Sequence, residues 1–280
     1  MEHKLLIPLD GTESVQEILL YVESVTPRDD TEVTLLNVIP GRDGEVTGKT
    51  HAEEIQNGLV RDGWKVHHET RMGDPVEEIV KFIILWSATL VMMSTHGRSG
   101  LERIREGSVT EQVLRQSPCP VFILHTLRTE PADHRTSELF ERILVPLDGT
   151  ETSAAILDCV KRFATTHDSE VILFHDEMDS SLPEEDRAAV KAKLQDQSVA
   201  LANTGLAVTL DLSTYRRPIA EILKRIDALN ISLVSMATHG ETGDRRALDE
   251  SVTAEVIRHA NCPLLVWASE PQCPPVEPGG

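Results

Sequence analysis

Basic residues, aromatic side chains, cysteines and long apolar runs are all scarce in this chain of 280 residues. Lysine and arginine number 27 against 46 aspartates and glutamates, which gives a net charge of −19 at neutral pH. The acidity is spread evenly, because residues 1–138 carry 14 − 23 = −9 and residues 139–280 carry 13 − 23 = −10. Nucleic acids and anionic membranes attract basic surfaces, so the composition argues against both as partners.

The other scarce features bear on the core and on the cell compartment. Aromatic residues make up 4% of the chain, so Leu, Ile, Val and Ala must build most of any core. The four cysteines, at positions 119, 159, 262 and 273, form no CxxC pair and are too few for a disulfide scaffold. No run approaches the roughly 20 apolar residues of a membrane span, and the N-terminal sequence lacks a signal-peptide core. We therefore expect a reduced, cytoplasmic location.

Three sequence blocks occur twice and in the same order. PLDGTE is found at 8–13 and at 146–151, STHG at 94–97 is matched by ATHG at 237–240, and SVTEQVLRQSPCP at 108–120 by SVTAEVIRHANCP at 251–263. The two copies of each block are 138 or 143 residues apart. This spacing is far longer than a solenoid repeat and indicates a duplicated domain. We expect a first domain at residues 1–128, a linker at 129–139, a second domain at 140–269 and a disordered Pro-rich tail at 270–280.

Apolar runs and helical patterns alternate along each copy. Strands are predicted at 4–9, 33–39, 65–71, 90–94 and 121–125, and again at 142–147, 171–174, 207–212, 232–236 and 264–267. Helices are predicted at 13–25, 51–61 and 76–86, and at 184–202 and 218–229. This alternation predicts an α/β fold of two tandem open doubly wound domains, each with a five-stranded parallel sheet. Ligands of such sheets bind beyond the carboxyl ends of the strands, where the strand order reverses.

Glycines and small polar residues cluster after the fourth strand of the first copy. STHG at 94–97 is followed by nine residues and then by GSVT at 107–110, where a helix opens. Glycines let backbone amides approach a phosphate, and a helix N-terminus adds unpaired N–H groups. The alternative is that Gly97 only ends a strand and that Ser108 or Thr110 only caps the helix. No Walker A loop occurs, and no GxGxxG follows the first strand.

Asp10 and Asp148 follow the first strand of each copy. A carboxylate at this place can accept hydrogen bonds from a ribose hydroxyl or an adenine amine. The alternative is that each aspartate caps the helix that follows it.

Together these blocks resemble the universal stress protein family. The pattern is Pro-x-Asp-Gly-Thr/Ser-Glu after the first strand, then Thr-His-Gly, nine residues and Gly-Ser-Val, then Cys-Pro before the last strand. The resemblance covers nearly the whole chain, twice. It implies an adenine nucleotide alpha hydrolase-like fold, a regulatory role in stress response rather than an enzymatic one, and ATP or ADP as ligand, with or without Mg²⁺. A slow ATPase activity stays open, because no general base stands out beyond Asp10.

The resemblance also implies which residues of the first copy contact the nucleotide. The family's phosphate motif of Gly, two residues, Gly, nine residues and Gly-Ser/Thr has Ser94 in place of its first glycine. The backbone near Val38 would read the adenine. The implied contacts are Pro8, Leu9, Asp10, Val38, Met93, Ser94, His96, Gly97, Gly107, Ser108, Val109 and Thr110.

The second copy departs from this motif. Glu250 replaces the last glycine, where a phosphate would lie, and Asp176 replaces Val38. The loop at 98–106 carries three Arg and two Glu, or +1, whereas 241–250 carries two Arg and four acidic residues, or −2. We predict nucleotide binding in the first domain and none, or very weak binding, in the second.

Other functions and assemblies remain open on the sequence. An interaction module that has lost nucleotide binding is favoured by Ser94 and opposed by Gly107 and Ser108. A nucleotidyl-transfer enzyme is opposed by the lack of a Ser-Gly-Gly-x-Asp-Ser loop. No catalytic set is predicted, because His96 and His239 have no nucleophile or carboxylate pattern beside them. No metal set is predicted either, since the adjacent His67 and His68 of one strand point to opposite faces.

The last strand of each copy, at 121–125 and 264–267, would be an exposed sheet edge. In the resembled family such strands pair between subunits, so we expect an intramolecular pseudo-dimer, with a homodimer of chains as the alternative. The resemblance also implies protein partners, which the sequence does not identify.

Overall fold

Buried aliphatic runs form the strands of each domain in the computed structural model of the chain. The structure describes residues 3–10, 15–39, 49–95, 109–125, 139–177, 183–237 and 252–267. These residues fall into two compact units, 3–125 and 139–267. We call them the first and the second domain.

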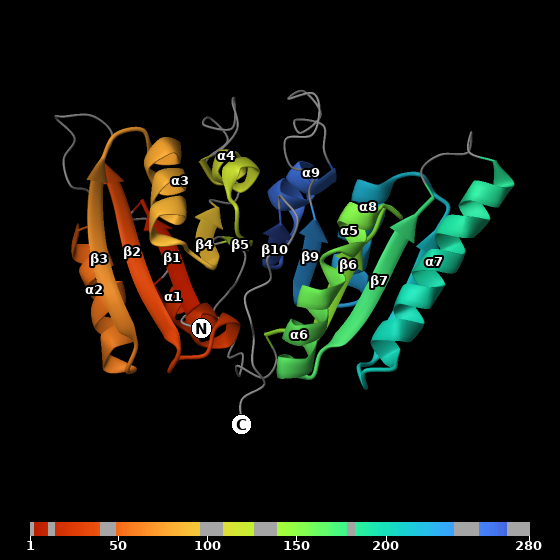
Figure 1. Cartoon of the computed structure of the whole chain (residues 1–280), viewed down its shortest axis with the longest axis horizontal. Helices are drawn as coiled ribbons and strands as arrows, with labels where there is room; N and C mark the ends of the chain where they lie inside the picture. The colour runs from red at the N-terminus through yellow and green to blue at the C-terminus, as the bar shows by residue number, and fades with distance from the viewer. Residues whose placement is uncertain are drawn as a thin grey trace. The chain divides into compact units, whose positions relative to one another are not determined.

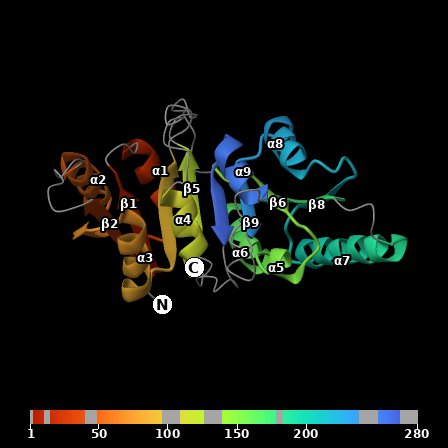
Figure 2. The same cartoon turned by 90° about the horizontal axis from the view of Figure 1, so that it is seen from above.

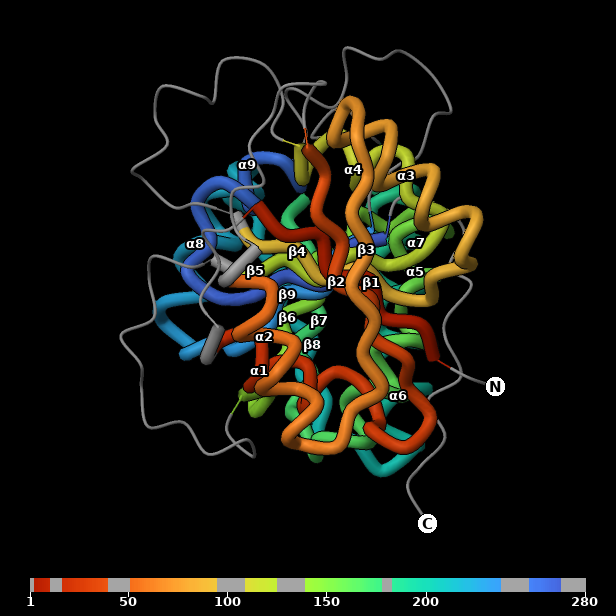
Figure 3. The backbone as a smooth tube through the Cα atoms, turned by 90° about the vertical axis from the view of Figure 1, so that its left-hand side faces the viewer, coloured from red at the N-terminus to blue at the C-terminus, as the bar shows by residue number. Residues whose placement is uncertain are grey.

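The first domain holds a parallel sheet in the order β3-β2-β1-β4-β5 (Figure 1). Its strands are β1 (His3–Leu9), β2 (Thr31–Ile39), β3 (Lys65–Met72), β4 (Leu90–Thr95) and β5 (Val121–His125). Its helices are α1 (Val15–Val25), α2 (Lys49–Arg61), α3 (Pro75–Trp86) and α4 (Val109–Gln116). In Figure 2, α1 and α2 lie on one face of this sheet and α3 and α4 on the other, and Figure 3 shows the same domain from its β3 edge.

The second domain repeats this arrangement in the order β8-β7-β6-β9-β10, again with parallel neighbours. Its strands are β6 (Arg142–Pro146), β7 (Glu170–Asp176), β8 (Val208–Ser213), β9 (Leu233–Ala237) and β10 (Leu264–Trp267). Its helices are α5 (Glu151–Ala154), α6 (Leu157–His167), α7 (Glu184–Ala202), α8 (Pro218–Ala228) and α9 (Val252–His259). The predicted tandem doubly wound fold is therefore confirmed.

The burial of consecutive strand residues agrees with a parallel sheet covered by helices on both faces. Leu5, Leu6 and Ile7 are consecutive in β1 and all buried, which requires cover on both faces of the sheet. Strand β3 instead alternates between exposed and half-buried residues, as expected at a sheet edge. As the low aromatic content predicts, most buried side chains are aliphatic, with a few aromatic contacts such as Tyr21 with Phe122, whose ring centroids are 5.6 Å apart.

Local signals fix the helix ends. The Asp74 carboxylate accepts a hydrogen bond from the Glu77 amide at 3.0 Å, and Pro75 occupies the first helical position of α3. The helix ends at Ser87, which has a left-handed backbone with φ 56°. In the second domain the equivalent end is Asn230, with φ 50°. The two copies thus share the left-handed turn that follows this helix.

Two features of the second domain were not foreseen from the sequence. The segment after β6 forms two helices, and a turn at residues 155–156 separates α5 from α6. Cys159 is disulfide-bonded, which the argument from cysteine number did not anticipate. The buried thiols of Cys119 and Cys262 are free.

Candidate functional site

The strand order of the first domain reverses at β1. The chain runs from β1 outward to β2 and β3, then returns to β4 on the other side of β1. Backbone pairing of β1 with β2 runs from His3–Thr31 to Leu9–Asn37, whereas pairing with β4 is limited to Leu5–Leu90 and Leu6–Val91. The ladder between β1 and β4 thus stops before either strand ends. This reversal is the place where open doubly wound sheets bind ligands.

Several predicted contact residues meet at this place. Leu9 ends β1 and is followed by the exposed Asp10, while the buried Met93 and the half-buried Ser94 lie near the end of β4. Of the predicted contacts, the structure describes Pro8, Leu9, Asp10, Val38, Met93, Ser94, Val109 and Thr110. His96, Gly97, Gly107 and Ser108 lie outside the described residues.

Helix α4 begins at the predicted position and packs against β4. Its first residue, Val109, is partly exposed, and the next, Thr110, is buried. A helix N-terminus carries unpaired N–H groups and about half a positive charge, which favours a nearby anion. Val38, the predicted adenine reader, lies half-buried in β2 and is paired in register with Arg71 of β3.

A polar contact that the sequence reasoning missed holds the end of β1. The Asn37 amide donates a hydrogen bond to the Leu9 carbonyl at 3.3 Å, and its Oδ1 lies 2.7 Å from His68 Nε2. This asparagine is buried within the apolar strand β2. The only sequence signal for this contact was the single asparagine within the run Val-Thr-Leu-Leu-Asn-Val-Ile. In the second domain His175 takes the same place, with Nδ1 2.8 Å from the Leu147 carbonyl.

The carboxylate after β6 is already bound within its own turn. Asp148 accepts hydrogen bonds from the backbone N–H of Thr150 at 2.8 Å and from its hydroxyl at 2.7 Å. The Thr150 side chain then accepts from the Ser153 amide at 3.1 Å and caps α5. The sequence alternative that Asp148 itself caps the helix is therefore wrong. Asp148 orients the residue that does.

Helix α7 covers the same turn. Its Lys193 ammonium donates to the Gly149 carbonyl at 3.2 Å and to the Glu151 carboxylate at 2.6 Å. Gly149 has φ +88°, and a Cβ at this residue would lie 2.7 Å from a methyl group of Val190. The strand-exit turn of the second domain is thus in contact with its own helix.

Asp176 has an internal role in the second domain. Phe174 pairs with Pro146 as Leu36 pairs with Pro8, so Asp176 and Val38 are equivalent in register. The buried Asp176 carboxylate accepts hydrogen bonds from the Arg216 amide at 3.2 Å and the Arg217 amide at 2.7 Å. It therefore holds the loop that leads into α8.

The prediction that His67 and His68 point to opposite faces of the sheet is confirmed. His67 pairs with Glu32 at 2.9 Å and His68 contacts Asn37, on opposite faces of the sheet. Within the described parts of the chain, no three His, Cys, Asp or Glu side chains gather as a metal site would require. Within those same parts, no helix has the length and apolar character to cross a bilayer.

The fold defines a class of protein: tandem doubly wound α/β domains, in each of which the strand order reverses at the first strand. The family model of the Universal stress protein family matches residues 1–125 and 139–267, nearly the full length of both domains. The chain belongs to the universal stress protein family.

Individual relatives agree with this assignment. A universal stress protein of Methanocaldococcus jannaschii is 32% identical over 143 residues, which span 45% of this chain and 84% of the relative. A putative universal stress protein of Staphylococcus aureus is 31% identical over 158 residues, spanning 49% of this chain and 95% of the relative. These relatives therefore correspond to one of the two domains.

The tandem fold also occurs among solved structures. The structure of a universal stress protein from Archaeoglobus fulgidus aligns with 95% of this chain over 98% of its own length, with a TM-score of 0.71 and 23% identity. A putative universal stress protein from Pseudomonas aeruginosa covers 96% of this chain and 94% of its own, with a TM-score of 0.67 and 17% identity. Both show that the fold of the whole chain is a known one.

Proposed function

We propose that this universal stress protein binds ATP or ADP, with or without Mg²⁺, in its first domain, and regulates a stress response without acting as an enzyme. The nucleotide would lie beyond the carboxyl ends of β1 and β4. The base and ribose would contact the backbone near Val38 and the carboxylate of Asp10. The phosphates would contact the segment from Ser94 to Thr110, with the N-terminus of α4 favouring their charge.

The observation that carries this proposal is a difference between equivalent residues of the two domains. In the second domain the carboxylate of Asp148 is bound to Thr150, and that of Asp176 to two loop amides. The first domain has a valine at the position of Asp176, so no carboxylate is tied to a loop there, and Asp10 is exposed at the end of β1. The contact groups of the second domain thus serve its own turns.

Charge supports the same division between the domains. Residues 98–106 have a sequence charge of +1, whereas residues 241–250 sum to −2. Near a phosphate, each carboxylate at about 4 Å costs on the order of 1 kcal/mol in a solvated cleft. We therefore propose that the second domain binds nucleotide very weakly or not at all.

Titration calorimetry of the full chain with ATP and with ADP tests this proposal. We expect one nucleotide per chain, binding at least about tenfold weaker in Asp10→Ala, because a hydrogen bond to a charged group contributes about 1.5–3 kcal/mol. The matched control Asp148→Ala should leave the affinity unchanged. Two equal sites, or equal losses in the two variants, would overturn the proposal.

A second pair of variants tests the charge argument. Gly107→Glu places in the first domain the residue that the second has at position 250, and should abolish binding by repelling the phosphates. Glu250→Gly, the reverse change, should leave the first site unaffected. Unchanged binding by Gly107→Glu would show that the phosphates lie elsewhere.

An interaction module without nucleotide is the second candidate function. Ser94 favours it, because its side chain lies half-buried at the end of β4, where the family's phosphate motif has glycine. In that case the wild-type chain should give no binding heat with ATP or ADP, and Ser94→Gly should create binding.

A further inference from the structure

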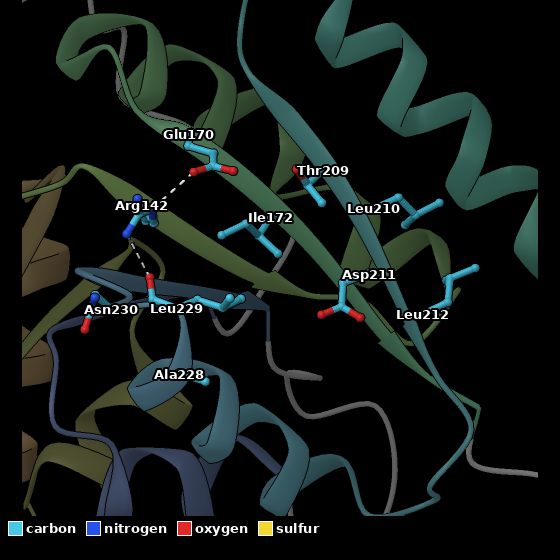
Figure 4. Close-up of a pocket in the computed structure, with 10 residues that line it drawn as sticks. All are labelled: Arg142, Glu170, Ile172, Thr209, Leu210, Asp211, Leu212, Ala228, Leu229 and Asn230. Atoms are coloured by element: carbon cyan, nitrogen blue, oxygen red, sulfur yellow. Dashed lines mark hydrogen bonds and ion pairs between the residues drawn. The ribbon is translucent and has the colours of Figure 1, made fainter.

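A pocket of about 560 Å³ opens beside the C-terminal end of α8 in the second domain (Figure 4). Arg142 and Glu170, the first residues of β6 and β7, lie on one side of it, and Leu229 and Asn230 follow α8. The pocket therefore lies at the amino end of these strands, away from the strand-exit turn. Pockets of this volume accept small molecules.

The first domain supplies an internal template for this pocket. The Arg142 amide donates to Ser232 Oγ at 2.9 Å, just as the Lys4 amide donates to Thr89 Oγ1 at 3.0 Å. Each cationic side chain also donates to the last turn of a helix. Arg142 reaches the Leu229 carbonyl at 3.1 Å, and Lys4 reaches the Trp86 carbonyl at 3.1 Å. Arg142 and Leu229 are thus equivalent to Lys4 and Trp86.

An aromatic ring fills this place in the first domain. The Lys4 ammonium lies 5.5 Å from the centroid of the half-buried Trp86 ring, within the range of a cation–π contact. The Trp86 ring in turn lies 5.8 Å from the ring of Phe82. The template position therefore consists of a cation, a helix-end carbonyl and two packed rings.

The second domain keeps the cation and lacks both rings. Leu229 replaces Trp86, and Arg225 replaces Phe82. The Arg225 guanidinium forms two hydrogen bonds to Asp211, at 2.6 and 3.0 Å, and lies 4.1 Å from the Phe174 ring centroid. Arg142 stays in place, because Nε donates to Glu170 at 3.2 Å (Figure 4). The smaller Leu229, which lines the pocket in place of a tryptophan, leaves room for a ring here.

The pocket also offers polar groups that could meet the edge of a ring. Thr209 lines it from β8, on the strand face that Asp211 turns toward α8. Among the described residues, neither the Thr209 hydroxyl nor the Asn230 side-chain amide has a hydrogen-bond partner. Ile172 provides an apolar surface in the middle of the site.

We propose that this pocket binds a small molecule with a planar aromatic ring, which takes the place that the Trp86 ring fills in the first domain. The ring lies against the Arg142 guanidinium and Ile172, and its polar edge reaches Thr209 or Asn230. This site is separate from the proposed nucleotide site, and neither proposal depends on the other.

Indole, the ring system of the missing tryptophan, is the probe that tests the site. In amide NMR spectra of the full chain, indole should shift the signals of Arg142, Thr209 and Leu229. Leu229→Trp refills the position and should abolish these shifts. Ala220→Trp, which adds a tryptophan at an exposed position of the same helix, should leave them intact.

Two further comparisons separate aromatic recognition from simple apolar binding. Phenol should bind about two- to fivefold more tightly than cyclohexanol, which has the same number of heavy atoms but no π face. Trp86→Leu opens the equivalent place beside Lys4 and should produce indole-dependent shifts in the first domain. The proposal is overturned if indole shifts no pocket residue in the wild-type chain, if Leu229→Trp binds it equally well, or if Trp86→Leu gains no shifts.

Discussion

Val38 and Asp176 hold the same register position in the two domains and act differently. Val38 has an apolar side chain, so only its backbone can form hydrogen bonds at the end of β2. The Asp176 carboxylate instead accepts hydrogen bonds from the backbone amides of Arg216 and Arg217. Arg216 has a left-handed backbone with φ 56°, which is unfavourable for a residue with a side chain. The carboxylate therefore stabilises a loop conformation that the chain alone disfavours.

Replacing this carboxylate should destabilise the second domain. Asp176→Val leaves two backbone N–H groups without their acceptor and should cost about 2 kcal/mol or more of unfolding free energy. Asp176→Asn keeps one acceptor oxygen and should cost less. Urea unfolding of the full chain, followed by a probe in the second domain, measures both. Equal stability of Asp176→Val and wild type would contradict this role.

The two free thiols should resist modification in the folded protein. Burial raises the pKa of Cys119 from 9.0 to about 11 and that of Cys262 to about 12. Since the thiolate is the reactive form, the Cys119 thiolate fraction at pH 8 should be about 100-fold below that of a free cysteine. Alkylation with iodoacetamide, read by peptide mass spectrometry, should modify both residues only after unfolding. Rapid modification of the native chain would contradict this.

The same shifts predict a pH dependence of stability. Folding raises these pKa values, so the buried thiol form contributes its full stability below about pH 9. This contribution should decline as the pH rises from 9 toward 11, because the unfolded chain then releases its thiol protons first.

At the scale of elements, α7 distinguishes the second domain most clearly. It has 19 residues, against 13 in its counterpart α2. Its residues Val190 and Lys193 lie against the turn after β6. A longer helix thus covers the turn that, in the first domain, we propose to face a nucleotide.

Gly149→Ala tests the packing of α7 on this turn. The new Cβ would meet Val190 at 2.7 Å and would also occupy a backbone with φ +88°. Gly205→Ala is the matched control, since Gly205 has φ +95° and no atom within 4 Å of its added Cβ. The control should lose about 1 kcal/mol from backbone strain, and Gly149→Ala about 1–3 kcal/mol more from the clash. Equal losses in thermal unfolding would show that α7 does not constrain the turn.

Most strands and helices could be predicted because the same order of apolar runs and helical patterns occurs in both copies. Continuous apolar runs located the strands, and β5 and β10 match their predicted bounds. Strand β2 begins at Thr31, earlier than predicted, because buried polar residues leave no apolar signal. No helix bounds were predicted between β6 and β7, where the structure has α5 and α6.

The site was predictable only to the level of motifs. Residue types located Asp10, Val38 and Ser94 at strand ends, and the structure makes β1 and β4 neighbours in the sheet. The contacts of Asn37, Asp148 and Asp176 depend on distances between strands and loops far apart in sequence. The pocket beside Arg142 was also beyond sequence reasoning, because its lining comes from β6, β7, β8 and the end of α8, which are far apart in sequence.

At the scale of the whole molecule, the chain is a duplicated domain in which the copies have diverged. Their net charges are almost equal, at −9 and −10, so global charge does not distinguish them. The differences are local and lie at the strand-exit turn, at position 176 and in the longer α7. The predicted pairing of the two domains as an intramolecular pseudo-dimer stays a prediction.

Native mass spectrometry of the full chain in the presence of ATP or ADP tests the division between the domains most directly. Counting bound nucleotides on each intact chain shows how many sites work, independently of any substitution. We predict one nucleotide per chain at saturation, bound at least about tenfold more weakly by Asp10→Ala and with unchanged affinity by Asp148→Ala. Two nucleotides of equal affinity on each chain, or a single one whose affinity is the same in Asp10→Ala, would contradict a working first domain and a degenerate second.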